Sequence, residues 1–297
     1  MTDPAPKIAV TVLGGYLGAG KTTLLNNILC RADERLAVLV NDFGEINIDA
    51  ALIESVNGTT INLANGCVCC TLADGLANTL LDIDGLEPRP ERLIIETSGV
   101  ANPAGVAAYC HRRGFRLDAV VVLVDAETIT TGVDDIYIGE TVRSQLRAAD
   151  LVVLNKVDLV DASTLESARG VVVAEAPLVP IVETVNAELT PEVLFDRQTM
   201  SSQGEVHSHG ADFETWSFSE STPITRDEID RFMADLSQDI VRVKGLVQLN
   251  DDSRRHVLQR VGPRWTLSPS GEWDDAPNTT LVAIGRPGSE PTWPGST

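Results

Sequence analysis

The sequence has few cysteines, few basic residues and no long apolar run, and each shortage excludes a class of protein. It contains five cysteines in 297 residues, an odd and clustered set that does not suit a secreted disulfide framework. No stretch approaches the roughly 18 apolar residues that span a bilayer. The N-terminal residues lack the basic region and long apolar run of a signal peptide. We therefore expect a protein of the reducing cytoplasm with no membrane partner.

Basic residues are outnumbered, since 23 Lys and Arg stand against 43 Asp and Glu, and the formal net charge is −20. Such a surface repels phosphate backbones, so we expect no nucleic-acid partner. Apolar residues make up 43% of the chain, which is enough for one large or two modest packed domains.

The first two-thirds of the chain alternate short, continuous apolar runs with helix-length amphipathic segments. The runs lie at 7–13, 36–41, 92–96, 119–125, 151–155 and 177–182. Runs that are apolar on both faces are typical of parallel strands covered by helices on both sides. The pattern predicts an α/β domain with a doubly wound, mostly parallel sheet, whose ligands bind beyond the carboxyl ends of the strands.

The last third has a different pattern. We assign 1–197 to the first domain and 198–211, which is polar and rich in Gly and Ser, to a linker. Alternating strands and a capping-box helix at 225–238 predict a small α+β domain over 212–286. We expect a disordered tail at 287–297.

A phosphate-binding loop of the form G-x-x-x-x-G-K-[ST] occupies Gly15–Thr22, directly after a predicted strand and before a predicted helix. Its glycines allow backbone N–H groups to surround phosphates at a helix N-terminus. Lys21 would reach the β- and γ-phosphates, and the Thr22 hydroxyl would bind Mg²⁺. The motif predicts a P-loop NTPase fold. The residues assigned to nucleotide contact here are Gly15, Gly18, Ala19, Gly20, Lys21, Thr22 and Thr23.

The motif Asn155-Lys156-x-Asp158, at the end of a later predicted strand, indicates which base the nucleotide has. A carboxylate accepts hydrogen bonds from N1–H and the 2-amino group of guanine, a match that adenine cannot make. GTP is therefore expected rather than ATP, and tighter ATP binding would favour a P-loop kinase instead. Asn186 lies where a base-flanking loop would follow the next strand.

Glu96 ends another predicted strand and Gly99 follows three residues later. We expect Glu96 to hold Mg²⁺ through water and the Gly99 N–H to meet the γ-phosphate. Lys21, Thr22 and Glu96 are thus the candidate catalytic residues. No Gln or His follows Gly99, so the residue that orients the attacking water is not identified, and we expect slow intrinsic turnover.

Three thiols, Cys67, Cys69 and Cys70, lie within four positions after a turn-forming Asn-Gly. Thiolates bind soft or borderline ions such as Zn²⁺ and Co²⁺, and three leave a tetrahedral ion one ligand short. Water, a client side chain or a carboxylate such as Glu45 would complete it. A transferable metal site is the favoured interpretation; a closed structural zinc site, a redox pair and inert cysteines are the alternatives. We expect the remaining cysteines, at 30 and 110, to be small core residues.

These motifs together resemble the CobW-like GTPases, the group that includes the HypB and UreG metallochaperones. The segments that carry the resemblance are VNDFGEINID (40–49), NGCVCCTL (65–72), IIETSGVANP (94–103) and VRVKGLVQL (241–249). The resemblance covers nearly the whole chain, including a CobW-type C-terminal domain. It implies a GTPase that converts GTP and water to GDP and phosphate, binds Zn²⁺ or Co²⁺, and transfers the metal to a client metalloprotein.

Two departures from the family pattern concern metal binding. Asp42 replaces a Glu that is sometimes counted among the metal-binding candidates, and the His-rich linker is reduced to HSH at 207–209. We expect Mg-GTP to order 41–49 and the thiol loop together, with Asp49 contacting Mg²⁺ through water. Two further functions stay open: a cobalt-delivering GTPase of cobalamin synthesis, and a regulatory GTPase with a structural zinc. The oligomeric state is open between a monomer and a nucleotide-dependent dimer.

Overall fold

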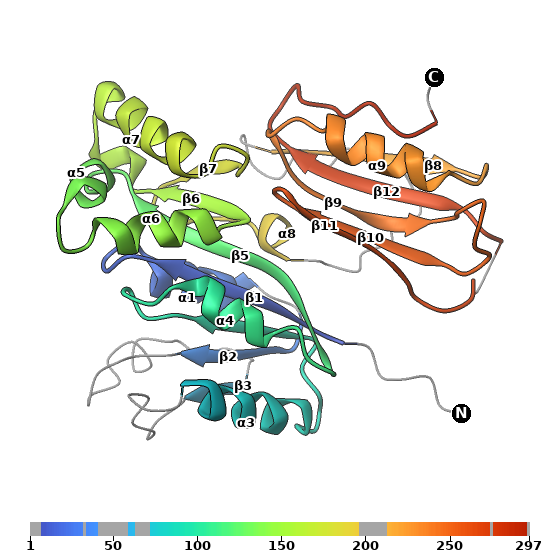
Figure 1. The fold of residues 1–297 in the computed structure, drawn as a ribbon, viewed down its shortest axis with the longest axis horizontal. Coiled ribbons are helices and arrows are strands. Elements are labelled where there is room, and N and C mark those ends of the chain that lie inside the picture. The colour runs from blue at the N-terminus through green and yellow to red at the C-terminus, as the bar shows by residue number, and fades with distance from the viewer. Residues whose placement is uncertain are drawn as a thin grey trace. The chain divides into compact units, whose positions relative to one another are not determined.

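The computed structural model describes residues 7–31, 34–40, 59–62, 72–195, 213–273 and 276–295. The chain divides into two compact units, which are Met1–Pro177 with Ile181–Asp196 and Leu178–Pro180 with Arg197–Thr297. Figure 1 shows the elements of both units. The predicted linker at 198–211 lies outside the described residues, and the boundaries at 197 and 212 stay predictions.

The first unit is built on a seven-stranded sheet with the order β3-β2-β4-β1-β5-β6-β7. Every neighbouring pair is parallel. The strands are β1 (Ile8–Gly15), β2 (Leu36–Val40), β3 (Thr59–Asn62), β4 (Arg92–Glu96), β5 (Phe115–Asp125), β6 (Leu151–Asn155) and β7 (Ile181–Thr184). All residues of β1, β2, β4 and β6 are buried, because helices cover both faces. The predicted doubly wound α/β class is confirmed.

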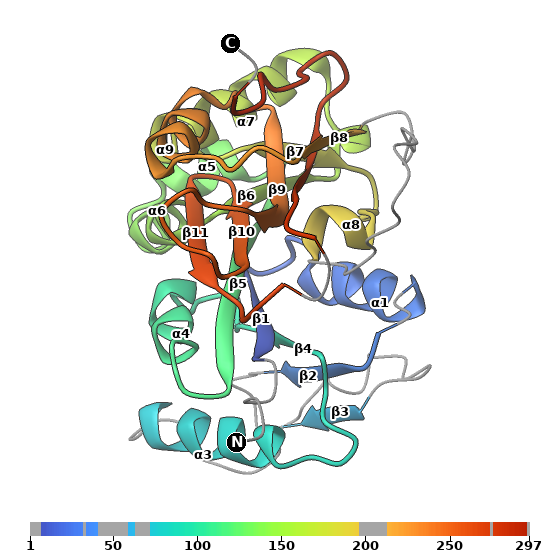
Figure 2. The same ribbon diagram turned by 90° about the vertical axis from the view of Figure 1, so that its right-hand side faces the viewer.

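Helices connect these strands on both sides of the sheet. They are α1 (Lys21–Arg31), α3 (Leu72–Asp84), α4 (Pro103–Tyr109), α5 (Ile129–Asp134), α6 (Gly139–Ala148), the 3₁₀ helix η1 (Val157–Leu159), α7 (Ala162–Glu175) and α8 (Pro191–Leu194). Figure 2 shows α4 and α6 on one face of the sheet and α1 and α8 on the other. Within the described ranges, no helix has the length and apolar character needed to cross a bilayer.

The parallel arrangement gathers the carboxyl ends of the strands at one edge. Glu96 pairs in register with Leu13 of β1, just before the phosphate loop. Asp125 lies beside Asn155, and Asn155 lies beside Thr184. Residues from distant parts of the sequence therefore meet at this edge, which is where open α/β sheets bind ligands.

Two strands differ from the sequence-based expectation. The last parallel strand begins at Ile181 rather than at 177, because Pro177 and Pro180 have no backbone N–H to donate to a ladder. Strand β3 was not predicted: its four residues, TTIN, are too few and too polar to form an apolar run.

The second unit pairs an antiparallel sheet with one helix, which confirms the predicted α+β class. The sheet order is β11-β10-β9-β12-β8. The elements are β8 (Glu214–Glu220), α9 (Arg226–Asp235), β9 (Ile240–Val247), β10 (His256–Val261), β11 (Arg264–Pro269) and β12 (Thr279–Gly285). Ile229 and Phe232 of α9 pack with Val243, Leu258 and Leu281 from one face of the sheet. All four tryptophans of the chain belong to this unit.

The predicted capping box is present at the start of α9: the Thr225 hydroxyl accepts from the Glu228 N–H, and the Glu228 carboxylate accepts from the Thr225 N–H. The expectation of a disordered tail is wrong for residues 287–295. Trp293 stacks on Phe218, with ring centroids 5.4 Å apart, and contacts Phe232 at 5.8 Å. Burial of so large an aromatic surface offsets the entropy lost in ordering the segment.

Candidate nucleotide site

The phosphate loop runs from the end of β1 to the first turn of α1, and its glycines have backbone angles that other residues rarely adopt. Gly15, Gly18 and Gly20 have φ values of 131°, 77° and 104°. A Cβ atom on Gly15 would lie 2.3 Å from the carbonyl oxygen of Leu123, and one on Gly20 would lie 2.5 Å from Nδ2 of Asn155. The loop thus requires glycine at these two positions for space as well as for backbone conformation.

Lys21 is 8% exposed and folds back over the loop that precedes it. Its ammonium donates to the carbonyl oxygens of Gly15, at 2.9 Å, and Tyr16, at 3.2 Å. These bonds hold the positive charge above the turn that the glycines form. The charge lies beside the helix N-terminus, where the α1 dipole also favours anions.

Thr22 and Glu96 come together from the start of α1 and the end of β4. The Thr22 hydroxyl donates to Oε1 of Glu96 at 2.9 Å, and Glu96 is 3% exposed. A hydroxyl and a carboxylate are hard oxygen donors of the kind that Mg²⁺ prefers beside bound phosphates. The pair therefore fits a magnesium ion. Of the other loop residues, Ala19 is buried and Thr23 is exposed.

The segment after β4 is held against the phosphate loop. Thr97 donates to the carbonyl oxygen of Leu13 through both its N–H, at 2.9 Å, and its hydroxyl, at 3.0 Å. Gly99 lies so close to Leu17 that an added Cβ would be 2.5 Å from its Cδ2 atom. From the other side, the Gln145 side chain of α6 donates to the carbonyl oxygens of Gly99 and Ala101. Gly99 is thus confined between two elements.

Asn155, the last residue of β6, contacts the phosphate loop, the end of β7 and the loop after β7 through a side chain that is 2% exposed. Its Nδ2 donates to the carbonyl oxygen of Ala19 at 3.0 Å. Its Oδ1 accepts from the Thr184 hydroxyl, at 3.1 Å, and from the Ala187 N–H, at 2.7 Å. The amide therefore fastens the phosphate loop to the loop after β7, and its oxygen is engaged by the protein rather than directed at a base.

Lys156 and Asp158 follow at the end of β6. Lys156 has a φ of 64°, and its ammonium lies 2.6 Å from the carboxylate of Asp125, which is 8% exposed. This ion pair fixes the direction of the lysine side chain. Asp158 is exposed in the 3₁₀ helix η1 and carries its carboxylate at the surface.

The loop after β7 holds two consecutive residues in the left-handed backbone conformation. Asn186 and Ala187 both have a φ of 52°, an uncommon conformation outside glycine. The Asn27 side chain from α1 donates to both of their carbonyl oxygens, at 2.9 and 3.1 Å. Together with Asn155, this amide holds the loop beside the phosphate loop. Sequence reasoning placed Asn186 here but missed Asn27, Asp125 and Gln145.

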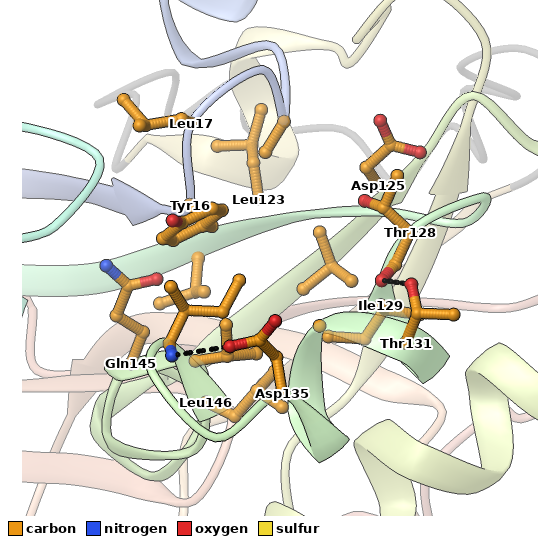
Figure 3. A pocket seen from close by; sticks show the side chains of 16 residues that line it. Tyr16, Leu17, Leu123, Asp125, Thr128, Ile129, Thr131, Asp135, Gln145 and Leu146 are labelled. Carbon is orange, nitrogen blue, oxygen red and sulfur yellow. Dashed lines mark hydrogen bonds between the residues drawn. The ribbon is translucent and has the colours of Figure 1, made fainter. Parts of the chain in front are cut away.

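A cavity of about 270 Å³ lies beside the phosphate loop. Figure 3 shows its wall, which combines Tyr16 and Leu17 of the loop with Asp125 at the end of β5 and Gln145 of α6. The rest of the lining is mainly aliphatic and comes from β5, α5 and α6. The cavity borders the residues that position Lys156 and Gly99 without including either of them.

The predicted metal ligands, Cys67, Cys69, Cys70, Asp42, Glu45 and Asp49, lie outside the described residues, as do the two linker histidines. In the part of the chain that is described, no cluster of three His, Cys, Asp or Glu side chains could hold a metal. Cys110 is buried, which raises the pKa of its thiol to about 12, as a core residue would show. The expectation of a core position is wrong for Cys30, which is exposed near the end of α1.

Comparisons with known proteins match both units. Residues 9–182 match the family described as CobW/HypB/UreG, nucleotide-binding domain, and 213–292 match the cobalamin synthesis protein cobW C-terminal domain. The chain is 31% identical to the zinc chaperone CobW of a Sinorhizobium species, over 94% of this chain and 93% of the relative. It is 30% identical to the zinc chaperone YjiA of Escherichia coli K12, over 94% of each. The Zn(II)-bound YjiA crystal structure has a TM-score of 0.45 at 24% identity over 95% of both chains.

Proposed function

The chain belongs to the CobW/HypB/UreG family, and from that premise we propose that it is a GTP-hydrolysing metal chaperone. It binds Zn²⁺ through Cys67, Cys69 and Cys70 and transfers the ion to a client metalloprotein, under control of the bound nucleotide. The observation that best supports GTP binding is the set of hydrogen bonds of the Asn155 side chain, which joins the phosphate loop to the loop after β7. The names of the relatives, zinc chaperones in both bacteria, support the metal half.

Guanine selection is assigned to Asp158, because its carboxylate is exposed and it follows, two residues later, the lysine that Asp125 holds in place. An Asp158→Asn variant replaces one acceptor oxygen by an amide donor. We expect it to lose GTP affinity at least tenfold and to gain affinity for XTP, whose 2-oxo group accepts a hydrogen bond. Competition titrations with GTP, XTP and ATP measure the change. Equal GTP binding by both proteins would remove Asp158 from the site.

Hydrolysis of GTP to GDP and phosphate is assigned to the residues around the loop. Lys21 neutralises charge on the β- and γ-phosphates once its ammonium turns from the loop carbonyls to the ligand. Thr22 and Glu96 would hold Mg²⁺, which when bound offsets negative charge on the phosphates. Gly99 presents its N–H to the γ-phosphate. This positions the nucleotide but supplies no described residue for orienting water, in line with slow turnover that a client would accelerate.

Metal transfer is assigned to the thiol loop, with Asp42 and Glu45 as further candidate ligands, whereas Asp49 is the candidate that contacts Mg²⁺ through water. Three thiolates bind a borderline ion firmly yet leave a coordination position for a client ligand. Ordering of this loop by GTP would raise metal affinity, and hydrolysis would lower it. A tenfold difference needs about 1.4 kcal/mol of coupling between the two sites. One contact that depends on the γ-phosphate suffices for that.

A competitive Zn²⁺ and Co²⁺ titration with Mg-GTP or Mg-GDP tests this proposal. We expect Zn²⁺ affinity at least tenfold higher with GTP, and loss of that site when Cys67, Cys69 and Cys70 are replaced by Ser. Cys30→Ser is the matched control, since its thiol is exposed but outside the motif. Equal affinity with both nucleotides would eliminate the coupling. Zinc that resists chelators in both states would favour a structural ion, and preference for Co²⁺ would favour cobalt delivery.

A further inference from the structure

Gln145 is a buried polar residue that neither the phosphate motif nor the base motif includes. It lies on α6, a covering helix of the sheet, and it is 2% exposed. Its Nε2 donates to the carbonyl oxygen of Gly99 at 3.1 Å and to that of Ala101 at 2.9 Å. A primary amide has two N–H donors, so these bonds use both of them. The side chain is therefore fully committed as a donor to one segment of backbone.

That segment is the turn after β4. The Ala101 N–H donates to the carbonyl oxygen of Ser98 at 3.0 Å, which closes the turn around Gly99. The turn is fixed at its start by the two bonds from Thr97 to β1, and it ends where the Asn102 side chain caps α4. The Gln145 side chain contacts the middle of the turn, between these two fixed ends. It thus controls the orientation of the peptide groups beside Gly99.

We propose that Gln145 is the positioning residue for the γ-phosphate contact of Gly99. The inference rests on the proposed GTPase function and assigns a residue to it. Leu17 confines Gly99 on one side. The hydrogen bonds from Gln145 on the other side therefore fix the position of the glycine backbone. Both amide hydrogens face carbonyl oxygens, so Gln145 acts through the turn and does not orient the attacking water. GDP has no γ-phosphate, and its binding does not require the turn in this position.

The variant Gln145→Met tests the assignment, because methionine has nearly the same length and no donor. The side chain borders the aliphatic cavity shown in Figure 3, so a thioether has apolar neighbours to contact. We expect single-turnover GTP hydrolysis about tenfold slower than in wild type, and weaker binding of a non-hydrolysable GTP analogue. GDP affinity should stay within twofold. Ser144→Ala is the matched control, since that hydroxyl donates only within α6, to the carbonyl oxygen of Thr141.

A second variant, Gln145→Glu, covers the case in which methionine prevents folding. A glutamate carboxylate faces two carbonyl oxygens without a proton to donate, and protonation restores one donor. We expect its hydrolysis rate, relative to wild type at the same pH, to recover as the pH falls. A relative rate that does not change with pH would contradict the proposal.

The outcomes separate this proposal from the function on which it depends. Wild-type protein that fails to hydrolyse GTP would refute the GTPase function itself. Wild-type hydrolysis matched within twofold by Gln145→Met would refute the role of Gln145 alone. A parallel loss of GDP affinity in Gln145→Met would also refute it, because the residue would then support the whole unit. A loss confined to hydrolysis and to the GTP analogue establishes the positioning role.

Discussion

Replacement of Asn155 by Ala tests whether its amide holds the nucleotide unit together. The substitution removes one bond to the Ala19 carbonyl and two bonds to Oδ1, from the Thr184 hydroxyl and the Ala187 N–H. Ala187 is fully buried and Ala19 is 2% exposed, so water does not readily replace the lost partners. A buried polar group left unpaired costs about 1–3 kcal/mol. The hydroxyl can rotate toward another acceptor, so two groups count fully.

The expected loss is therefore about 3 kcal/mol in the unfolding free energy of the nucleotide unit. For a domain of this size that lowers the melting temperature by about 6–12 °C. GDP affinity should also fall, because the loops on either side of the nucleotide separate. Urea unfolding followed by far-ultraviolet circular dichroism measures the first effect, and a GDP titration measures the second.

Thr184→Val is the companion variant, since it removes one of the three bonds and keeps the shape of the side chain. It should cost about 1 kcal/mol, and in the Asn155→Ala background it should cost clearly less, because its partner is already gone. A loss below about 1 kcal/mol for Asn155→Ala would refute the reasoning. So would full additivity of the two variants, since additivity would show that the side chains do not interact.

Three further predictions concern other parts of the chain. Gly20→Ala should weaken GDP binding more than tenfold in titration, because its Cβ would lie 2.5 Å from a side-chain amide nitrogen in addition to the strain of its positive φ. Gly18→Ala carries the strain of a φ of 77° without a clash, so it should lose less. Thr225→Ala should destabilise the second unit by about 1 kcal/mol at pH 7 in urea unfolding. Hydrogen bonds from Thr225 lower the pKa of Glu228 below its ordinary 4.5, so the ionised carboxylate stabilises the fold above that pH. The difference in unfolding free energy between wild type and Thr225→Ala should therefore shrink as the pH falls below 4.5. Trp293→Ala should cost about 1–3 kcal/mol in the same assay, and an unchanged midpoint would mean that its ring stacking contributes nothing to stability.

The fold class could be predicted because parallel strands buried on both faces appear in the sequence as short, continuous apolar runs. Runs such as 92–96 and 151–155 correspond residue for residue to β4 and β6. The errors occurred where tertiary contacts decide the outcome. β3 is a four-residue polar strand stabilised by pairing with β2, and in the 287–295 segment Trp293 packs on Phe218 and Phe232. Neither contact has a local pattern.

The candidate site was predictable where a motif fixes spacing along the chain. Glycine positions in the phosphate loop and the carboxylate at the end of β4 follow from the motifs alone. Asn27 and Gln145 are different, because each acts on backbone more than 40 residues away in sequence. A polar side chain in the middle of a covering helix was the available signal. The role of such a side chain can be recognised only once the strand order is known, because the strand order decides which backbone groups it contacts.

The placement of every tryptophan in the second unit has a practical consequence. Indole emission reports on the environment of that unit, while the nucleotide unit contributes no indole signal. A change in emission when GTP or GDP is added would therefore record a response transmitted from one unit to the other. The unlabelled protein thus carries its own optical reporter of interdomain communication.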